Sequence, residues 1–304
     1  MHIPEQMMNG AVCPVTAGIA VTGLAVAGYA ALKTKKKPSP FLFAAVAGFI
    51  FAAQMLNFPI GGGTSGHYLG AAFAAIALGT PFGILAMALI VALQAVVFSD
   101  GGLTVLGANI VNMSIIGAGL PGILYSMFFR KNENALSRLS GIFFVSFLSV
   151  IAAASLCSLE LSISTTGSAG DIFSAMMKPH SLIALAESSA TVVFAAVFSG
   201  IKLQSNDRAW NKTFIVLAAF IMALVISPFA SSFPDGLESA AGHLGILKES
   251  APLFVTPLSD YTVSGSDKFW AVSLAGAFGI LLIIISVLLA GVFFRKTAKA
   301  VLKK

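Results

Sequence analysis

The sequence contains few charged residues. Only 10% of its 304 residues are Asp, Glu, Lys or Arg, whereas 57% are hydrophobic and the mean hydropathy is +0.93. Water-soluble domains carry about 25% charged residues, so this composition excludes a soluble globular protein and predicts a membrane protein. The pI of about 9.4 does not indicate nucleic-acid binding, because the basic residues stand in short clusters beside hydrophobic runs. We therefore expect a protein that contacts membrane lipid and no nucleic acid.

Further absences exclude classes of chemistry. The two cysteines, Cys13 and Cys157, lie in apolar stretches without the spacing of a disulfide or metal pair, and we interpret them as core residues. No Gly-x-x-x-x-Gly-Lys-[Ser/Thr] motif occurs, so the chain cannot hydrolyse ATP by itself. No hydrophobic segment carries paired carboxylates or a serine–histidine set, which argues against an intramembrane enzyme. We expect no enzymatic activity.

Apolar segments make up most of the chain. A membrane-spanning helix needs about 20 mostly apolar residues. The segments that approach this length are residues 11–32, 41–58, 67–78, 81–98, 103–129, 139–159, 179–201, 213–231 and 269–294. The third would be only about 18 Å long as a helix, so we expect a buried Gly-rich loop before it and His67 at the start of its helix. The predicted fold is an all-α polytopic membrane protein.

The lysine and arginine residues follow a topological bias. If Lys33 is cytoplasmic, the alternation of the segments places all but three of the 18 basic residues on the same side; the exceptions are Lys178, Lys248 and Lys268. This distribution obeys the positive-inside rule. It predicts an extracytoplasmic amino terminus, a cytoplasmic carboxyl terminus, and His67 on the same outer face as the first residues.

The first two residues, Met1-His2, form a pattern that can bind a metal. A free terminal amine, the deprotonated amide nitrogen of His2 and its imidazole Nδ1 can chelate one cation and leave one equatorial position open. An all-nitrogen tetragonal set suits Ni(II) or Cu(II), whereas zinc prefers a tetrahedron and magnesium prefers oxygen. Most histidines near the start of a chain bind nothing, but the topology brings His67 to the same face. We expect Met1 to be retained with its amine free.

Other polar residues within the apolar segments are candidates for supporting roles. Asn109 and Asn112 are three residues apart, and we expect them to hold a loop or a metal ligand in place, or to hydrogen-bond between helices. His180 and Glu187 share one helical face, where structural pairing and a role around the metal or at its entry are both open. His67 either binds metal as a neutral imidazole near a helix amino terminus or caps that helix.

The composition changes after Ile201. The remaining chain contributes two apolar segments around a polar outer loop that contains Pro234-Asp235-Gly236-Leu237-Glu238. We expect residues 1–201 to form a metal-binding core of seven helices and residues 202–304 to form a two-helix accessory domain. His243 in the outer loop is a weaker candidate for metal entry, because an exposed loop histidine usually has no such role.

Four segments of the chain together resemble one family. They are Met1-His2-Ile3-Pro4, Gly62-Gly63-Thr64-Ser65-Gly66-His67, residues 100–109 (Asp-Gly-Gly-Leu-Thr-Val-Leu-Gly-Ala-Asn) and His180-Ser181-Leu182-Ile183-Ala184-Leu185-Ala186-Glu187. In combination they resemble the substrate-binding membrane component (S component) of energy-coupling-factor nickel and cobalt transporters. Residues 234–238 resemble the signature of the accessory two-helix component of these systems, here fused to the carboxyl end.

The resemblance implies a ligand set and partners. It implies a seven-helix core that holds Ni(II), or Co(II) through the same atoms, by the amine of Met1, the amide and imidazole of His2 and the imidazole of His67. It also implies a transmembrane coupling (T) protein and cytoplasmic ATP-binding-cassette ATPases, in the cytoplasmic membrane of a bacterium or archaeon. The chain departs from the family at Glu5-Gln6-Met7-Met8, behind the ligands, and at Gly66, where alanine is common.

The alternative function is an ion-coupled secondary metal carrier that works without an ATPase. Such a carrier predicts inverted repeats and charged pairs near the bilayer midplane, which the sequence does not show beyond Glu187. We therefore predict capture and uptake of a transition metal by the substrate-specific subunit of an ATP-driven transporter. The small residues of the first span pack either against the coupling protein or against the subunit's own helices.

Overall fold

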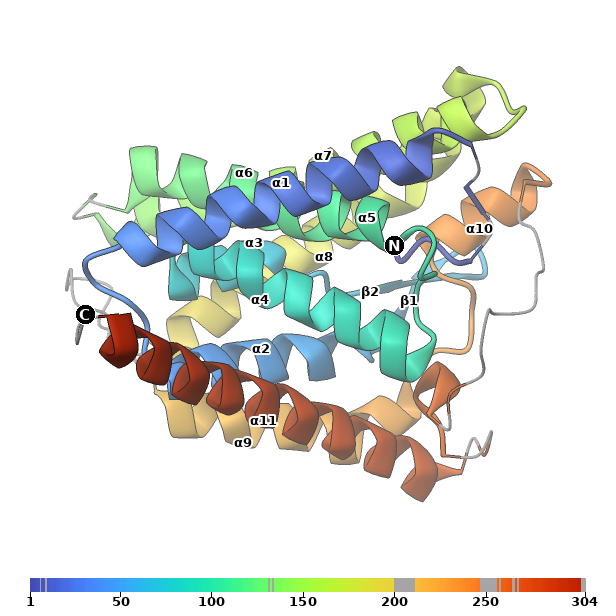
Figure 1. Ribbon diagram of the computed structural model, residues 1–304. Coiled ribbons are helices and arrows are strands. Elements are labelled where there is room, and N and C mark those ends of the chain that lie inside the picture. Colours follow the sequence, from blue (N-terminus) through green and yellow to red (C-terminus); the bar gives the residue numbers. More distant parts are fainter. Residues whose placement is uncertain are drawn as a thin grey trace.

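The computed structural model describes residues 1–301 apart from 6, 9, 131, 133, 200–210, 247–255, 257, 264–265 and 267; of residues 292–301 only the backbone is described. Several residues used above fall outside this part: Gln6, Lys131, Lys202, Arg208, Lys248, Lys303 and Lys304, together with the predicted boundary after residue 201. The helices confirm the predicted class, an all-α membrane protein (Figure 1).

Within the described residues, seven segments are long and apolar enough to cross a membrane. They are α1 (Val12–Lys33), α4 (Thr80–Leu93) with η1 (Gln94–Phe98), the run of α5 (Leu106–Asn109), η2 (Ile110–Ile116), α6 (Gly117–Leu124) and η3 (Tyr125–Phe129), α7 (Ala135–Ser164), α8 (Ala169–Phe198), the run of α9 (Lys212–Ile221), η4 (Met222–Ile226) and η5 (Ser227–Phe229), and α11 (Phe269–Val301). The shorter elements are α2 (Pro40–Gln54), β1 (Asn57–Gly61), β2 (Thr64–His67), α3 (Ala71–Leu78), α10 (Gly236–His243) and η6 (Ser259–Tyr261).

The predicted helix start at His67 is wrong, because this residue ends a strand. Strands β1 and β2 form an antiparallel hairpin in which Asn57 lies opposite His67. Pro59 has no N–H to continue helix α2, and Gly61 to Gly63 in the turn have positive φ angles of 100°, 62° and 73°, which glycine adopts without strain. Helix α3 begins only at Ala71, so the dipole of a helix does not act directly on the imidazole.

The hairpin lies at one end of the helical bundle, beside the amino terminus and α10, and α11 ends at the opposite end (Figure 1). The segment before α10 forms a backbone hydrogen bond with each of the two strands. The N–H of Ser65 donates to the carbonyl of Pro234 at 2.9 Å, and the N–H of Ser231 donates to the carbonyl of Asn57 at 2.8 Å. Each strand of the hairpin thus forms one backbone hydrogen bond with this segment.

Aromatic packing holds the bundle together beneath the hairpin. Phe49 of α2 meets Phe194 and Phe198 of α8 edge to face, with ring centroids 5.0 and 4.9 Å apart. Phe73 of α3 packs against the same three rings. Such pairs add to the burial of apolar area and restrict the orientation of the rings. The cluster therefore fixes α2, α3 and α8 relative to one another and supports the strand that carries His67.

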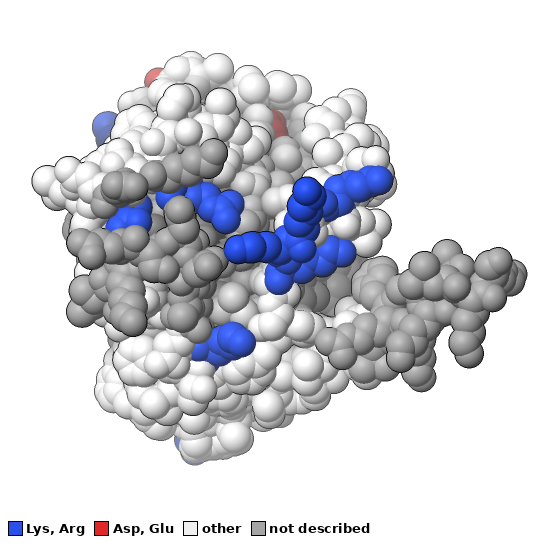
Figure 2. All heavy atoms as spheres, turned by 90° about the vertical axis from the view of Figure 1, so that its left-hand side faces the viewer, with Lys and Arg blue, Asp and Glu red and all other residues white. Residues whose placement is uncertain are grey.

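Basic side chains gather at the end of the bundle opposite the hairpin. Figure 2 shows this end, where several lysine and arginine side chains lie near one another and few acidic side chains are visible. The basic residues of the described chain in the turns and helix ends there are Lys33, Lys35, Lys36, Lys37, Arg130, Arg138 and Lys212. The two ends of the molecule thus differ in charge.

Close packing of α3 on α4 generates a prediction. A Cβ built on Gly83 would lie 2.6 Å from the Cα and 2.7 Å from the N of Ala75, so a larger side chain must push the helices apart. We expect Gly83→Val to destabilise the fold by about 1–3 kcal/mol, the usual cost of overpacking, seen as a lower melting temperature in detergent. Gly18→Val on α1, where no atom lies within 4 Å of the added Cβ, is the control. Equal melting temperatures would contradict the described packing.

Candidate metal centre

The amino-terminal segment is inserted into the end of the bundle that carries the hairpin. Met1 is 5% exposed and Ile3 is fully buried. Asn109 pairs with the backbone of Ile3 much as a neighbouring strand would: its Oδ1 accepts from the N–H at 2.8 Å, and its Nδ2 donates to the carbonyl at 3.1 Å. The N–H of Gly102 donates to the same carbonyl at 2.9 Å. The first residues are therefore held as firmly as an element of secondary structure.

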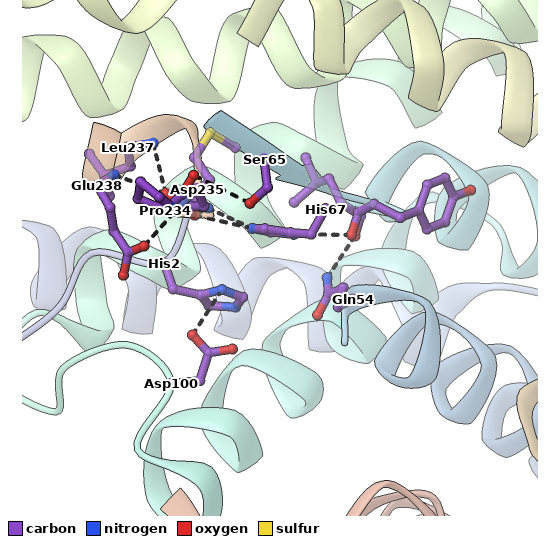
Figure 3. A network of polar contacts seen from close by, with 12 residues as sticks. His2, Gln54, Ser65, His67, Asp100, Pro234, Asp235, Leu237 and Glu238 are labelled. Carbon is purple, nitrogen blue, oxygen red and sulfur yellow. Dashed lines mark hydrogen bonds and ion pairs between the residues drawn. The ribbon is translucent and has the colours of Figure 1, made fainter. Parts of the chain in front are cut away.

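This insertion brings the predicted ligands together. The amine of Met1 lies 2.6 Å from Nε2 of His67, and the rings of His2 and His67 are stacked with centroids 5.4 Å apart and planes inclined by 22° (Figure 3). Metal–nitrogen bonds of about 2.0 Å place adjacent donors of a square about 2.8 Å apart. The amine and the His67 nitrogen thus have the spacing of two neighbouring ligands of one cation.

The binding nitrogen of His67 is selected by its surroundings. Nδ1 of the ring lies 3.4 Å from the carbonyl of Tyr68, which can only accept, so the proton is placed on Nδ1 and Nε2 keeps its lone pair. Glu187 of α8 fixes the backbone that follows. Its carboxylate oxygens accept from the N–H of Leu69 at 2.7 Å and of Gly70 at 3.0 Å. Glu187 therefore positions the strand end without contacting the ligand.

A buried chain of two glutamines selects the tautomer of His2. The carbonyl of Leu69 is an acceptor only, so the amide nitrogen of Gln54 must face it, at 2.7 Å. The oxygen of Gln54 then accepts from Gln94 at 2.8 Å, which leaves the oxygen of Gln94 facing Nε2 of His2 at 3.0 Å. Because an acceptor at the end of the chain needs a donor, His2 carries its proton on Nε2. Its Nδ1, the atom required for the chelate, then carries the lone pair and lies 3.3 Å from Oδ1 of Asp100.

Burial also keeps His2 in the form that binds metal. Removal from water lowers the pKa of His2 to about 4, with the charges of the terminal amine and His67 lowering it further and Asp100 opposing the shift. The imidazole is therefore neutral at physiological pH, and a neutral imidazole is the metal-binding form.

Two carboxylates that sequence reasoning missed lie beside the ligands. Oδ1 of Asp100 is 3.3 Å from Nδ1 of His2, while its other oxygen accepts from the hydroxyl of Tyr261. Oδ2 of Asp235 is 2.5 Å from the amine of Met1 and 3.5 Å from Nε2 of His67. Both Tyr261 and Asp235 come from the carboxyl-terminal third of the chain, which thus closes over the site.

The charge of Asp235 is maintained by its neighbours. Burial by itself would raise the pKa of Asp235, but the charged amine of Met1, with His67 beside it, holds this pKa well below its ordinary value. The only sequence signal for this residue is the Asp-x-x-Glu spacing of Asp235 and Glu238, which predicts a capping box at the start of a helix. That spacing predicts α10 and gives no indication that Asp235 reaches the amino terminus.

The other candidate residues are placed at different distances from the centre. Asn112 donates to a carboxylate oxygen of Glu160 at 2.6 Å and forms no pair with Asn109, because the π-helical turn η2 starts between them. His180 donates from Nδ1 to the carbonyl of Met176 at 2.7 Å. His243 is exposed in the last turn of α10. Of these residues, only His180 borders the ligands.

A small cavity connects His180 to the centre. Its volume of about 10 Å³ is close to the least that holds a water molecule. It is lined by Met1, His67, Leu69, Val150, His180, Ile183 and Asp235.

Comparison with known families divides the chain into two parts. Residues 2–205 match the family described as the cobalt uptake substrate-specific transmembrane region, and residues 210–296 match the PDGLE domain.

Individual relatives match over different lengths. A protein of Archaeoglobus fulgidus that carries the name fused nickel transport protein NikMN is 32% identical over 93% of this chain and 96% of its own length. The cobalt transport protein CbiM of Lachnoclostridium phytofermentans is 30% identical over 66% of this chain and 78% of its own. The crystal structure of a truncated transition metal transporter superposes with a TM-score of 0.57 at 28% identity, over 67% of this chain and all of that one.

The glutamine chain can be tested without touching a ligand. We expect Gln94→Met, which keeps the length of the side chain but removes both hydrogen bonds, to release the tautomer of His2 and weaken Ni(II) binding about 10- to 100-fold, the effect of losing a group that orients a metal ligand. Isothermal titration of the purified protein measures it. Thr191→Val, which removes a buried hydrogen bond to Tyr68 outside this chain, serves as control. Unchanged affinity in Gln94→Met would contradict the assigned role.

Proposed function

Because the chain belongs to the family of cobalt uptake substrate-specific transmembrane regions, joined here to a PDGLE domain, we propose that it captures nickel or cobalt as the substrate-binding subunit of an uptake transporter. The observation that carries this proposal is the convergence of the Met1 amine, His2 and His67 at one buried point. Relatives named as nickel and cobalt transport proteins support these two metals as cargo. The chain is a multi-pass membrane protein with a transport role, not an enzyme.

Four nitrogen atoms hold the cation in this proposal. The amine of Met1, the amide nitrogen of His2 and Nδ1 of His2 occupy three corners of a square, and Nε2 of His67 occupies the fourth. The 2.6 Å separation of the amine and Nε2 of His67, the stacked rings and the two selected tautomers all support this arrangement. A planar set of nitrogens favours Ni(II) over Co(II), although both ions can use the same donors.

The membrane orientation follows from the charge of the two ends. Lysine and arginine gather at the end opposite the candidate site (Figure 2). The positive-inside rule assigns that end to the cytoplasm. The amino terminus and the metal centre then face the outside, where the cation is captured, and the carboxyl terminus lies inside.

Transport energy comes from other proteins. The chain has no phosphate-binding loop for ATP, so we assign the driving force to a transmembrane coupling protein and cytoplasmic ATP-binding-cassette ATPases.

Helix α1 supports a docking role. Gly18 and Gly28 have no atom within 4 Å of a built Cβ, whereas Gly23 packs against Ile115 of the same subunit. The small residues therefore divide between internal packing and an outward face that a partner helix can approach closely.

The chain divides into two functional parts that correspond to the two family matches. Residues 1–201 form the core that contains Met1, His2 and His67, and residues 202–304 form the accessory domain. The matches over residues 2–205 and 210–296 support this boundary. Asn109 and Glu187 support the ligands from within the core. Asn112 hydrogen-bonds to Glu160 of α7, and His180 lines the small cavity next to the site.

An added residue before Met1 tests the chelate directly. It moves the amine away from His2 and breaks the chelate ring while every side chain is kept, so we expect tight Ni(II) binding and the absorption bands of the bound ion to disappear. The measurement is a Ni(II) titration of purified protein followed by visible absorption. A protein with one residue added at the carboxyl end is the control. Equal binding by both forms would sink the amino-terminal site and leave His67, His180 and His243 as the ligands to test.

Dependence on ATPases separates the two transport mechanisms. We expect ⁶³Ni uptake into cells to require the coupling protein and the ATPases, because the chain alone has no source of energy. Uptake that persists at the full rate after deletion of every ATPase partner would contradict this mechanism and favour an ion-coupled carrier.

A further inference from the structure

The two carboxylate oxygens of Asp235 have separate roles. Oδ1 accepts from the N–H groups of Leu237 and Glu238 at 2.8 and 2.9 Å and so caps α10. Oδ2 takes no part in the cap and points to the amine of Met1 and to His67 (Figure 3). Because Oδ1 is fixed by the helix, the direction of Oδ2 is fixed as well. The cap therefore aims one anionic oxygen at two of the nitrogens that hold the cation.

The position of Asp235 does not depend on its contact with the amine. The hydroxyl of Ser65 donates to the carbonyl of Phe233 at 2.7 Å, and Thr64 and Ser239 share a hydrogen bond of 2.8 Å between their hydroxyls. Leu237 is fully buried in a cluster that includes Ile3 of the amino-terminal segment. The accessory domain is thus anchored on β2 and on the inserted terminus, and it brings Asp235 to the site ready placed.

The distances of Oδ2 from two of the four nitrogens are compatible with an apical ligand. A donor above a square of nitrogens, with all bonds about 2.1 Å long, lies about 3.0 Å from each corner. Oδ2 is 2.5 Å from the amine of Met1 and 3.5 Å from Nε2 of His67, distances that bracket this value.

Charge balance gives an independent reason for an anion at this point. A divalent cation that displaces the amide proton of His2 leaves one net positive charge in a buried site. Burying an unpaired charge is costly, whereas a carboxylate bound to the ion neutralises it. The carboxylate of Asp235, with 14% of its side chain exposed and Oδ2 2.5 Å from the amine of Met1, is placed to meet this need, and Asp100 lies 3.3 Å from Nδ1 of His2 on the other side of the site.

We propose that Oδ2 of Asp235 is a fifth, apical ligand of the captured cation, so that the accessory domain completes the coordination sphere. The inference rests on the proposed four-nitrogen chelate and extends it. An apical oxygen converts a planar, diamagnetic Ni(II) centre into a five-coordinate, paramagnetic one. It also provides a site that Co(II), which does not favour a bare square of nitrogens, can occupy.

The experiment compares Ni(II) bound to the full-length chain and to Asp235→Asn, both with the native amino terminus. Asparagine keeps the oxygen that caps α10 but replaces the anionic oxygen with an amide nitrogen. We expect the native complex to be paramagnetic and five-coordinate, by NMR susceptibility and by nickel K-edge absorption. We expect Asp235→Asn to be diamagnetic and planar, with affinity about 10- to 100-fold lower. Glu238→Gln, which alters the capping box on the side away from the ligands, should retain the native spectrum.

The outcomes separate this inference from the proposed function. If the residue added before Met1 abolishes binding while Asp235→Asn leaves coordination and affinity unchanged, the chelate stands and the apical ligand is wrong. A planar, diamagnetic native complex also overturns the apical ligand. Should Asp235→Asn and Glu238→Gln lose affinity alike without a change in coordination number, Asp235 acts only by docking α10 and the inference fails. If the added residue leaves binding intact, the chelate itself fails.

Asp235→Ser guards against a folding defect. Serine also caps a helix but is too short to reach the amine, so it should give the same planar spectrum as Asp235→Asn. A five-coordinate spectrum in Asp235→Ser would overturn the assignment.

Discussion

Burial of the chain's own amino group is the constraint on which the outer half of the molecule depends. A charged or polar group taken out of water must find partners, or its burial costs several kcal/mol. Here the amine of Met1 contacts Nε2 of His67 and the carboxylate of Asp235. The β-hairpin supplies the first partner and the start of α10 supplies the second. The loop before α5 is shaped around the same segment, since a Cβ on Gly102 would lie 2.6 Å from the Cα of Glu5.

Rigidity around His2 comes from a chain of hydrogen bonds in which the donor and the acceptor of each bond are determined by the bond before it. The path from the carbonyl of Leu69, just after β2, runs through Gln54 of α2 and Gln94 of η1 and ends on His2, a proposed ligand. Each amide is oriented by the one before it, so the tautomer of His2 is set before any cation arrives. A site prepared in this way loses little conformational entropy on binding. The same path ties the two imidazoles to one another through the protein.

Part of this arrangement was predictable from the sequence. The membrane class follows from composition, and the shared outer face of Met1, His2 and His67 follows from the distribution of lysine and arginine. The helical boundaries are close to those expected for most segments, because hydropathy windows detect spans well. The hairpin was not predicted because its strands are short and lie between two apolar helices, α2 and α3. Proline and glycine near His67 were the available signals for it.

The polar residues around the candidate ligands could not be predicted from the sequence, for a different reason. Gln54, Gln94 and Asp235 come from three distant parts of the chain, and no periodicity relates them. Each is an ordinary polar residue within its own segment. Only the packing of α2, η1 and the start of α10 around the inserted terminus gives them a common role. Asn109 and Asn112 show the opposite case. Their spacing of three residues suggests one joint site, but a π-helical turn starts between them.

The cap of α10 has a thermodynamic consequence. In our proposal one carboxylate both caps this helix and binds the cation, which makes helix docking and cation binding linked equilibria. By reciprocity, whatever factor the cation adds to the stability of the docked helix, the docked helix adds to the affinity for the cation. On this proposal, a movement that lifts α10 from β2 also lowers the affinity for the cation, so one movement can serve both capture and release. The covalent linkage keeps α10 at a high effective concentration near the site, which favours its return for the next cycle.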